Sequence, residues 1–148
     1  LQLKATNLND LLREVTDTIR PVAEKAQVVL DTDLDLLLCP LMLDGPKVKQ
    51  ALLNLAMNAL EASPSGEHII IKTVVDHHGV NLHVIDGGPG IDREDVENIF
   101  KPFFTKKSKG TGLGLPIVKK IVQAHQGEIH FEGNEKKGVT FTIRFSAQ

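Results

Sequence analysis

The sequence has one cysteine, no tryptophan, no tyrosine and little excess charge, with a formal net charge of −2 at pH 7 over 148 residues. A single thiol excludes an intramolecular disulfide and a cysteine-based metal cluster. Cys39 follows the leucines at 36–38, and we expect it to be a buried small hydrophobic residue. The lack of a basic stripe with interleaved aromatic residues argues against a nucleic-acid-binding protein.

No apolar stretch is long enough to span a bilayer, and the start of the chain has no signal-peptide pattern. We therefore expect a cytoplasmic domain that makes no membrane contact of its own. The length suits a single domain, residues 1–148, with a substantial core. Because the chain begins with Leu1 in place of methionine, we expect a piece of a longer protein, and whether that parent protein is membrane-anchored stays open.

Hydrophobic periodicity predicts helices mixed with mostly antiparallel strands. Asn7 or Asn9 is expected to cap the first helix, Pro21 to kink or end it, and Asp44 to cap the second. Strands are expected at residues 1–5, 28–30, 36–38, 69–75, 80–85, 128–133 and 139–145, and helices at residues 8–22, 46–62, 92–99 and 115–125. This order predicts an α/β (α+β) two-layer sandwich, with a mixed, mostly antiparallel sheet packed against about three helices.

Two glycine-rich clusters interrupt this pattern. The first, Asp86–Gly90, follows the strand at 80–85, and the second, Gly110–Leu115, opens into the last helix. Glycine lets a backbone approach a ligand, and unpaired N–H groups at a helix start attract anions such as a polyphosphate. The first cluster alone is more often a simple turn. The second has the wrong spacing for a dinucleotide fingerprint, and neither ends as a Walker loop does.

Three polar side chains are candidates for binding a ligand together with these clusters. Asp86 accepts hydrogen bonds and cannot donate them, so it suits the exocyclic amine of adenine and repels the carbonyl of guanine. Asn54 and Asn58 lie one turn apart on one face of the second helix. Such amides are usually satisfied by local hydrogen bonds. A carboxamide oxygen also suits Mg²⁺, which takes its oxygen ligands from a few protein groups and from substrate phosphates.

The order of these motifs resembles the catalytic ATP-binding domain of sensor histidine kinases, in the Bergerat-fold superfamily shared with gyrase, the Hsp90 chaperones and MutL. The motifs are Asn54-x-x-x-Asn58, Asp86-x-Gly88-x-Gly90, Phe100-x-Pro102-Phe103-Phe104 and Gly110-Thr111-Gly112-Leu113-Gly114-Leu115. The similarity covers nearly the whole chain, and the phenylalanine-rich block at 99–105 is particular to histidine kinases. The resemblance implies an enzyme that binds Mg²⁺ and ATP and supplies the γ-phosphoryl group for autophosphorylation of a histidine in two-component signal transduction.

The resemblance also implies a role for each matching residue. Asn58 would coordinate Mg²⁺, Asn54 would contact the phosphates and take part in catalysis, and Asp86 would bind the adenine amine. Lys106, together with Lys107 and Lys109, would neutralise γ-phosphate charge, although loop lysines are about as often simply solvated. The other residues implied to contact ATP are Gly88, Gly90, Ile91, Phe100, Phe104, Thr105, Gly110, Thr111, Gly112, Leu113, Gly114 and Leu115.

The segment at 100–114 has no predicted helix or strand, and it is longer than most loops in compact domains. We expect it to be an ATP lid that is poorly ordered without nucleotide. In gyrase-like relatives a glutamate at the position of Asn54 activates water, so an asparagine there favours transfer to a protein nucleophile over hydrolysis. Val139 and Glu61 also depart from the family pattern, and we do not expect the polar contacts usual at those two positions.

The phosphoacceptor is expected to lie outside this chain, because no histidine here stands in a setting typical of one. The six histidines are His68, His77, His78, His83, His125 and His130. The expected partners are therefore the protein's own dimerisation domain, which carries the phosphoacceptor, and a response regulator. We expect the isolated domain to be monomeric and to bind no nucleic acid. A Bergerat-fold ATPase and a nucleotide-binding switch without chemistry are the alternatives to the kinase.

Overall fold

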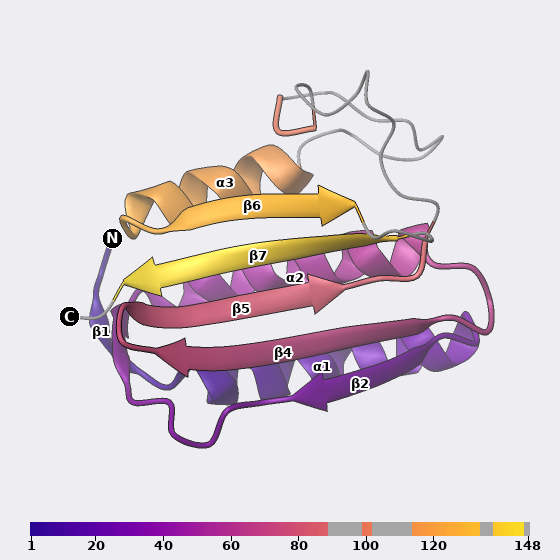
Figure 1. Ribbon diagram of the computed structural model, residues 1–148, viewed down its shortest axis with the longest axis horizontal. Coiled ribbons are helices and arrows are strands. Elements are labelled where there is room, and N and C mark those ends of the chain that lie inside the picture. The colour runs from indigo at the N-terminus through magenta and orange to yellow at the C-terminus, as the bar shows by residue number, and fades with distance from the viewer. Residues whose placement is uncertain (89–98, 102–113, 134–137, 147–148) are drawn as a thin grey trace.

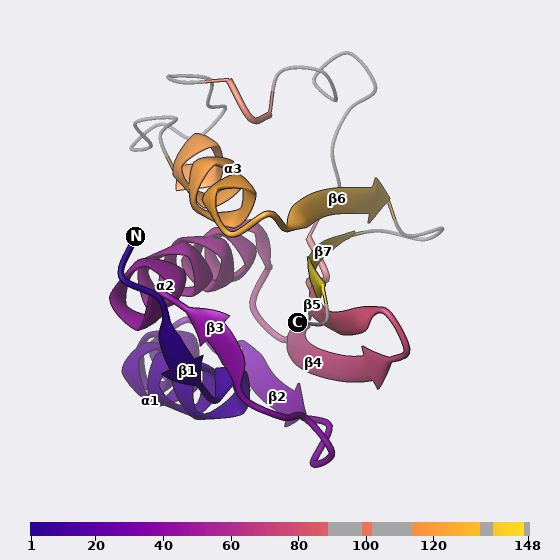
Figure 2. The same cartoon turned by 90° about the vertical axis from the view of Figure 1, so that its left-hand side faces the viewer.

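The computed structural model describes residues 1–88, 99–101, 114–133 and 138–146. In this part of the chain, a five-stranded sheet carries three helices on one face (Figure 1, Figure 2). The strands lie in the order β2-β4-β5-β7-β6 and are β2 (Val29–Asp33), β4 (His68–Asp76), β5 (Gly79–Ile85), β6 (Glu128–Gly133) and β7 (Val139–Ser146). The helices are α1 (Leu8–Lys25), α2 (Gly45–Ala62) and α3 (Gly114–Ala124). The predicted two-layer sandwich is confirmed.

Strand pairing is mixed, as the sequence predicts. Strand β2 runs parallel to β4, and the β4–β5, β5–β7 and β6–β7 pairs are antiparallel. The β4–β5 turn is held by the Asp76 carboxylate, which accepts hydrogen bonds from the backbone N–H groups of His78 (2.7 Å) and Gly79 (3.1 Å). A separate antiparallel ribbon joins β1 (Lys4–Thr6) to β3 (Leu41–Leu43).

Short polar side chains begin the two long helices. The Asn7 side chain accepts a hydrogen bond from the Asp10 N–H at 3.2 Å, and that of Asp44 accepts one from the Lys47 N–H at 3.3 Å. Helix α1 continues through Pro21 to Lys25, so the prediction that this proline ends the helix early is wrong. Proline removes the donor to the carbonyl of Asp17, and both residues are exposed, so water can satisfy that carbonyl.

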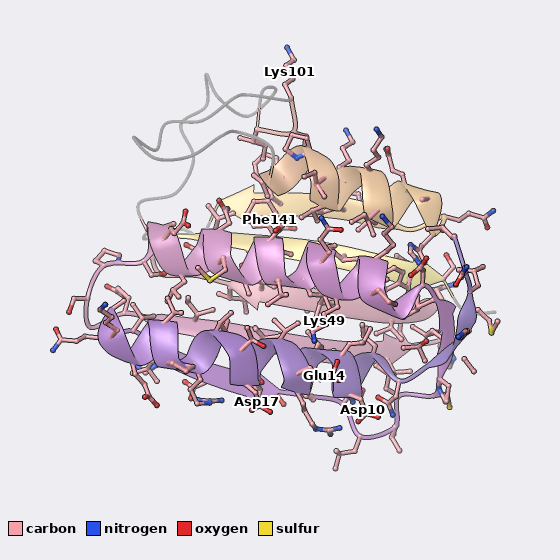
Figure 3. The ribbon with its side chains drawn as sticks, turned by 180° about the vertical axis from the view of Figure 1, so that it is seen from behind. Asp10, Glu14, Asp17, Lys49, Lys101 and Phe141 are labelled. Atoms are coloured by element: carbon pink, nitrogen blue, oxygen red, sulfur yellow. The ribbon has the colours of Figure 1, made fainter. Side chains whose placement is uncertain are left out.

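The core lies between the sheet and the helices. Its fully buried side chains include Leu8, Leu12, Leu55, Ile69, Leu82, Val118 and Ile143. Figure 3 shows α1 and α2 side by side over the sheet, with Lys49 of α2 directed at Glu14 of α1. The Lys49 Nζ lies 3.8 Å from the Glu14 Oε2; the Glu14 side chain is largely exposed and that of Lys49 is half-buried. Apolar burial therefore contributes far more than this ion pair to holding the helices in place.

The expected strand at 36–38 is absent, because Leu36 and Leu37 form an exposed turn and Leu38 leaves that turn to enter the core. Leu36 and Leu37 are 86% and 82% exposed, and the next strand is β3. The Asp35 carboxylate fixes the turn by accepting hydrogen bonds from the N–H groups of Val75 and Leu37, both at 3.0 Å, and these two hydrogen bonds, first that from Val75, lower the pKa of Asp35. Cys39 follows this turn and is exposed, so the prediction of a buried thiol is also wrong.

None of the helices in the described ranges combines the length and the apolarity needed to cross a bilayer.

Candidate functional site

Asp86 lies where β5 ends, between the following loop and the start of β7. Its side chain is buried, and its Oδ1 accepts hydrogen bonds from the N–H groups of Gly88 (2.9 Å) and Val139 (3.2 Å). The Asp86 N–H in turn donates to the Val139 carbonyl at 3.0 Å. A buried carboxylate is tolerated only with such partners, and together these hydrogen bonds fix its position between the two strands.

The loop after Asp86 packs against the end of α2. A Cβ built on Gly88 would overlap the carbonyl oxygen of Ala62, the last residue of that helix, whereas the nearest atoms to a Cβ on Gly87 belong to the Glu67 side chain, the closest being its Oε2 at 2.6 Å. Gly88 is therefore required by the close approach of two backbones. This gives a physical reason for the glycine that the sequence motif identifies.

The two asparagines of α2 lead toward this loop. Asn54, Asn58 and Ala62 are spaced four apart, so they follow one face of the helix. Asn54 and Asn58 are half-buried, next to the buried positions Leu55 and Ala59. Because Ala62 touches Gly88, the row of amides ends beside the loop that holds Asp86. The structure thus brings two of the motifs that the sequence analysis singled out to one end of the molecule.

The start of α3 faces toward the same end. Figure 1 shows α3 antiparallel to α2, with the first turn of α3 above the middle of α2 and its N-terminal end directed toward the side where α2 ends. Gly114 is the exposed first residue of α3, and a Cβ built there meets none of the described atoms within 4 Å. Leu115 packs against the core, so it also serves to seat the helix.

Phe100, the first residue of the expected lid, is anchored in an aromatic cluster. Its ring centroid lies 6.2 Å from that of Phe131 on β6 and 6.5 Å from that of Phe141 on β7. The Lys119 Nζ of α3 lies 5.2 Å from the Phe100 ring centroid, within range of a cation–π interaction. Phe100 therefore joins the root of the segment to the sheet and to α3.

Residues 102–113 of the expected lid and phosphate loop lie outside the described residues, as do residues 89–98. These two ranges include all but the last residue of the helix expected at 92–99, and Lys107 and Lys109. They also include the implied contact residues Gly90, Ile91, Phe104, Thr105, Lys106, Gly110, Thr111, Gly112 and Leu113.

Within the described ranges, no group of three or more histidine, cysteine, aspartate or glutamate side chains is placed to hold a metal ion. A site built from protein carboxylates is therefore not found in this part of the chain. The half-buried Asn58 amide fits a magnesium ion that takes only one or two ligands from the protein and the others from phosphates and water.

Sequence reasoning missed the part that Val139 plays. Its side chain departs from the family pattern, but both hydrogen bonds to Asp86 come from its backbone. A backbone contact depends on strand register and not on residue type, so no side-chain motif could have identified it. Glu61, the other departure, is exposed in the last turn of α2.

Replacing Gly88 by alanine should lower the free energy of unfolding by about 1–3 kcal/mol, because the added methyl group forces two backbones apart. Gly87→Ala is the matched control and should cost less, since its closest contact is the end of the flexible Glu67 side chain and not a backbone atom. Urea denaturation monitored by circular dichroism measures both values. Equal losses in the two variants would contradict the packing described here.

Comparison with known proteins extends the similarity over the whole chain. Residues 43–148 match the family model described as histidine kinase-, DNA gyrase B-, and HSP90-like ATPase. The chain is 36% identical over 145 residues to the sensor histidine kinase ZraS of Escherichia coli K12, covering 97% of this chain and 31% of ZraS. This chain thus spans less than a third of that relative.

Solved structures show the same fold. The nucleotide-free catalytic domain of the histidine kinase ThkA superimposes with a TM-score of 0.91 at 35% identity, covering 99% of this chain and 96% of that one. ThkA in complex with the response regulator protein TrrA matches with a TM-score of 0.85 at 33% identity, covering 99% of this chain and 42% of that one. The chain belongs to the histidine kinase-, DNA gyrase B-, and HSP90-like ATPase family.

Proposed function

We propose that this chain is the catalytic ATP-binding domain of a protein-histidine kinase. It binds Mg·ATP and presents the γ-phosphoryl group to a histidine on a separate dimerisation domain of the same protein, in two-component signalling. The observation that carries the proposal is the buried Asp86 carboxylate, fixed by Gly88 and Val139 at the end of the sheet where α2 ends.

Asp86 supplies the recognition of the base. The two backbone N–H groups on Oδ1 keep the carboxylate in one place, and an ionised carboxylate can accept further hydrogen bonds. An adenine amine would donate to it, whereas the guanine carbonyl at the same position would be repelled. Since the side chain is buried, water competes poorly for this hydrogen bond, and the discrimination between the two purines is strengthened.

The phosphates would then extend from the base toward α2 and α3. Asn58 would hold Mg²⁺ through its carboxamide oxygen, and Asn54 would contact the phosphates from the same face of α2. The N–H groups at the start of α3 would direct their partial positive charge toward the phosphates, and none of the described atoms lies within 4 Å of a Cβ built on Gly114. Magnesium bound there would neutralise negative charge on the phosphoryl group during its transfer. Lys106 would add a positive charge from the lid.

Transfer to a histidine requires little covalent chemistry from this domain. A histidine ring nitrogen forms a bond to the γ-phosphorus while the bond from that phosphorus to the bridging oxygen breaks, and ADP leaves. An asparagine has no basic group at neutral pH, so Asn54 can orient a phosphate but cannot activate water. The domain would therefore act by positioning the phosphates and stabilising their charge, and would favour the protein nucleophile over hydrolysis.

The implied partners follow from the same proposal. ThkA has been solved in complex with the response regulator TrrA, which supports a response regulator as the downstream partner of the protein that contains this chain. The dimerisation domain with its phosphoacceptor would lie in another part of that protein, and the isolated catalytic domain would be a monomer. We propose no nucleic-acid partner.

Replacing Asp86 by asparagine should weaken Mg·ATP binding about 10- to 100-fold, because a hydrogen bond to a charged acceptor is lost. The asparagine Oδ1 can still accept from Gly88 and Val139, which limits the effect on folding. The asparagine amide can also donate to a guanine carbonyl, so the preference for ATP over GTP should narrow. Isothermal titration calorimetry with both nucleotides measures this; unchanged ATP affinity would contradict the proposed base site.

A separately produced dimerisation domain of the parent protein tests the transfer step. With γ-labelled ATP and magnesium, its histidine should acquire phosphate that is acid-labile and stable to base, and the Asp86→Asn chain should transfer far less at the same nucleotide concentration. Tight ATP binding without any transfer would instead indicate a nucleotide-binding switch. Rapid release of free phosphate would indicate an ATPase.

A further inference from the structure

The two helices that carry the proposed phosphate and metal groups are joined at their opposite ends. In Figure 1, the N-terminus of α2 and the C-terminus of α3 lie together at the end of the molecule away from Asp86. There the Asp44 backbone N–H donates a hydrogen bond to the Nε2 of His125 at 3.0 Å. Asp44 is the N-cap of α2, and His125 follows the last residue of α3.

The hydrogen bonds of His125 define its protonation. Its Nδ1 lies 2.8 Å from the carbonyl oxygen of Ile121, which can only accept, so Nδ1 carries a proton. Its Nε2 accepts from Asp44 and is therefore unprotonated, so the ring is the neutral Nδ1–H tautomer. The ring also packs edge-on against Phe145 of β7, with centroids 6.2 Å apart. Each side of the imidazole thus contacts a different element.

Asp44 connects the same point to the beginning of the chain. Its Oδ2 accepts a hydrogen bond from the Gln2 backbone N–H at 3.0 Å, while its Oδ1 caps α2. The hydrogen bond from Gln2 contributes most to lowering the pKa of Asp44, which keeps the carboxylate ionised. Because the cap is held by its side chain and by its backbone, the first turn of α2 has a defined position relative to α3.

We propose that His125 is a positioning residue for nucleotide binding. By fixing the end of α3 on the cap of α2, it sets the placement of the two helices at their other ends, where the triphosphate would lie between Asn58 and the start of α3. This inference rests on the proposed function. A single apolar contact between the helices is non-directional, whereas the Asp44–His125 hydrogen bond is directional and adds a fixed point to the packed pair.

Helix length makes the far ends sensitive to this contact. From Asp44 to Asn58 is about 21 Å along α2, and from His125 to Gly114 is about 16 Å along α3. A tilt of about 5° at the hydrogen-bonded end therefore displaces the far end by roughly 1.5 Å. Displacements of that size matter for charge-assisted contacts with phosphate, whose favourable distances span only a few tenths of an ångström.

Two variants of the 148-residue chain separate positioning from simple stability. In His125→Gln, the Oε1 reaches the place of Nε2 and can accept from Asp44. In His125→Asn, the amide can donate to Ile121 as Nδ1 does, but no atom reaches Asp44. Both variants lose the ring contact with Phe145, so they are matched for that loss of packing.

The readout compares two ligands, Mg·AMP-PNP and AMP, by calorimetry at a temperature where circular dichroism shows each variant folded. His125→Asn should raise the dissociation constant of Mg·AMP-PNP about 5- to 10-fold and that of AMP less than 2-fold, since only the triphosphate spans both helices. His125→Gln should restore Mg·AMP-PNP binding to within about 2-fold of the original chain. The inference would be overturned if His125→Asn weakened the binding of both ligands equally, or if His125→Gln failed to restore the binding of Mg·AMP-PNP.

A second measurement needs no variant. Long-range ¹⁵N–¹H correlation spectra of the unaltered chain should show His125 as the Nδ1–H tautomer, and a proton on Nε2 would overturn the inference. If the unaltered chain binds neither ligand, the proposed function fails and the inference with it. If it binds both and the His125 variants do not separate them, only the inference fails.

Discussion

The site is organised around the burial of one negative charge. A carboxylate out of contact with water is costly unless hydrogen bonds replace its hydration, and Asp86 obtains two of them from the backbones of Gly88 and Val139. These bonds require that the loop after β5 and the start of β7 approach each other at a fixed register. The same approach brings Gly88 so close to the end of α2 that no side chain fits there.

Helix α2 connects this charge to the rest of the molecule. Its buried face packs on the sheet, its half-buried face carries Asn54 and Asn58, and its last residue touches the loop of Asp86. Its first residue follows a cap that also receives the end of α3 through His125. Because α2 is packed on the core and contacts both neighbours, it fixes the positions of the two parts of the proposed nucleotide site, one at Asp86 and one at the start of α3.

Much of the fold and of the candidate site could be predicted from the sequence, because the local sequence signals favour the same elements that the tertiary packing stabilises. The cap at Asp44, the helical spacing of α2 and the β4–β5 turn at Asp76 were all evident from residue type and period. The turn at 36–38 was not, since its three leucines suggest a strand. Asp35 instead takes its backbone and side-chain partners from Thr73, Val75 and Asn9, distant residues that no local pattern reveals.

The backbone contacts of Val139 and the contact between Asp44 and His125 were hidden for the same reason, since each joins elements far apart in the chain. A crystal structure of the chain with magnesium and AMP-PNP tests the account most directly. We expect the adenine amine within hydrogen-bond distance of the Asp86 carboxylate, and the metal ligated by the Asn58 oxygen. A nucleotide whose base lies away from Asp86, or whose metal has no contact with α2, would contradict it.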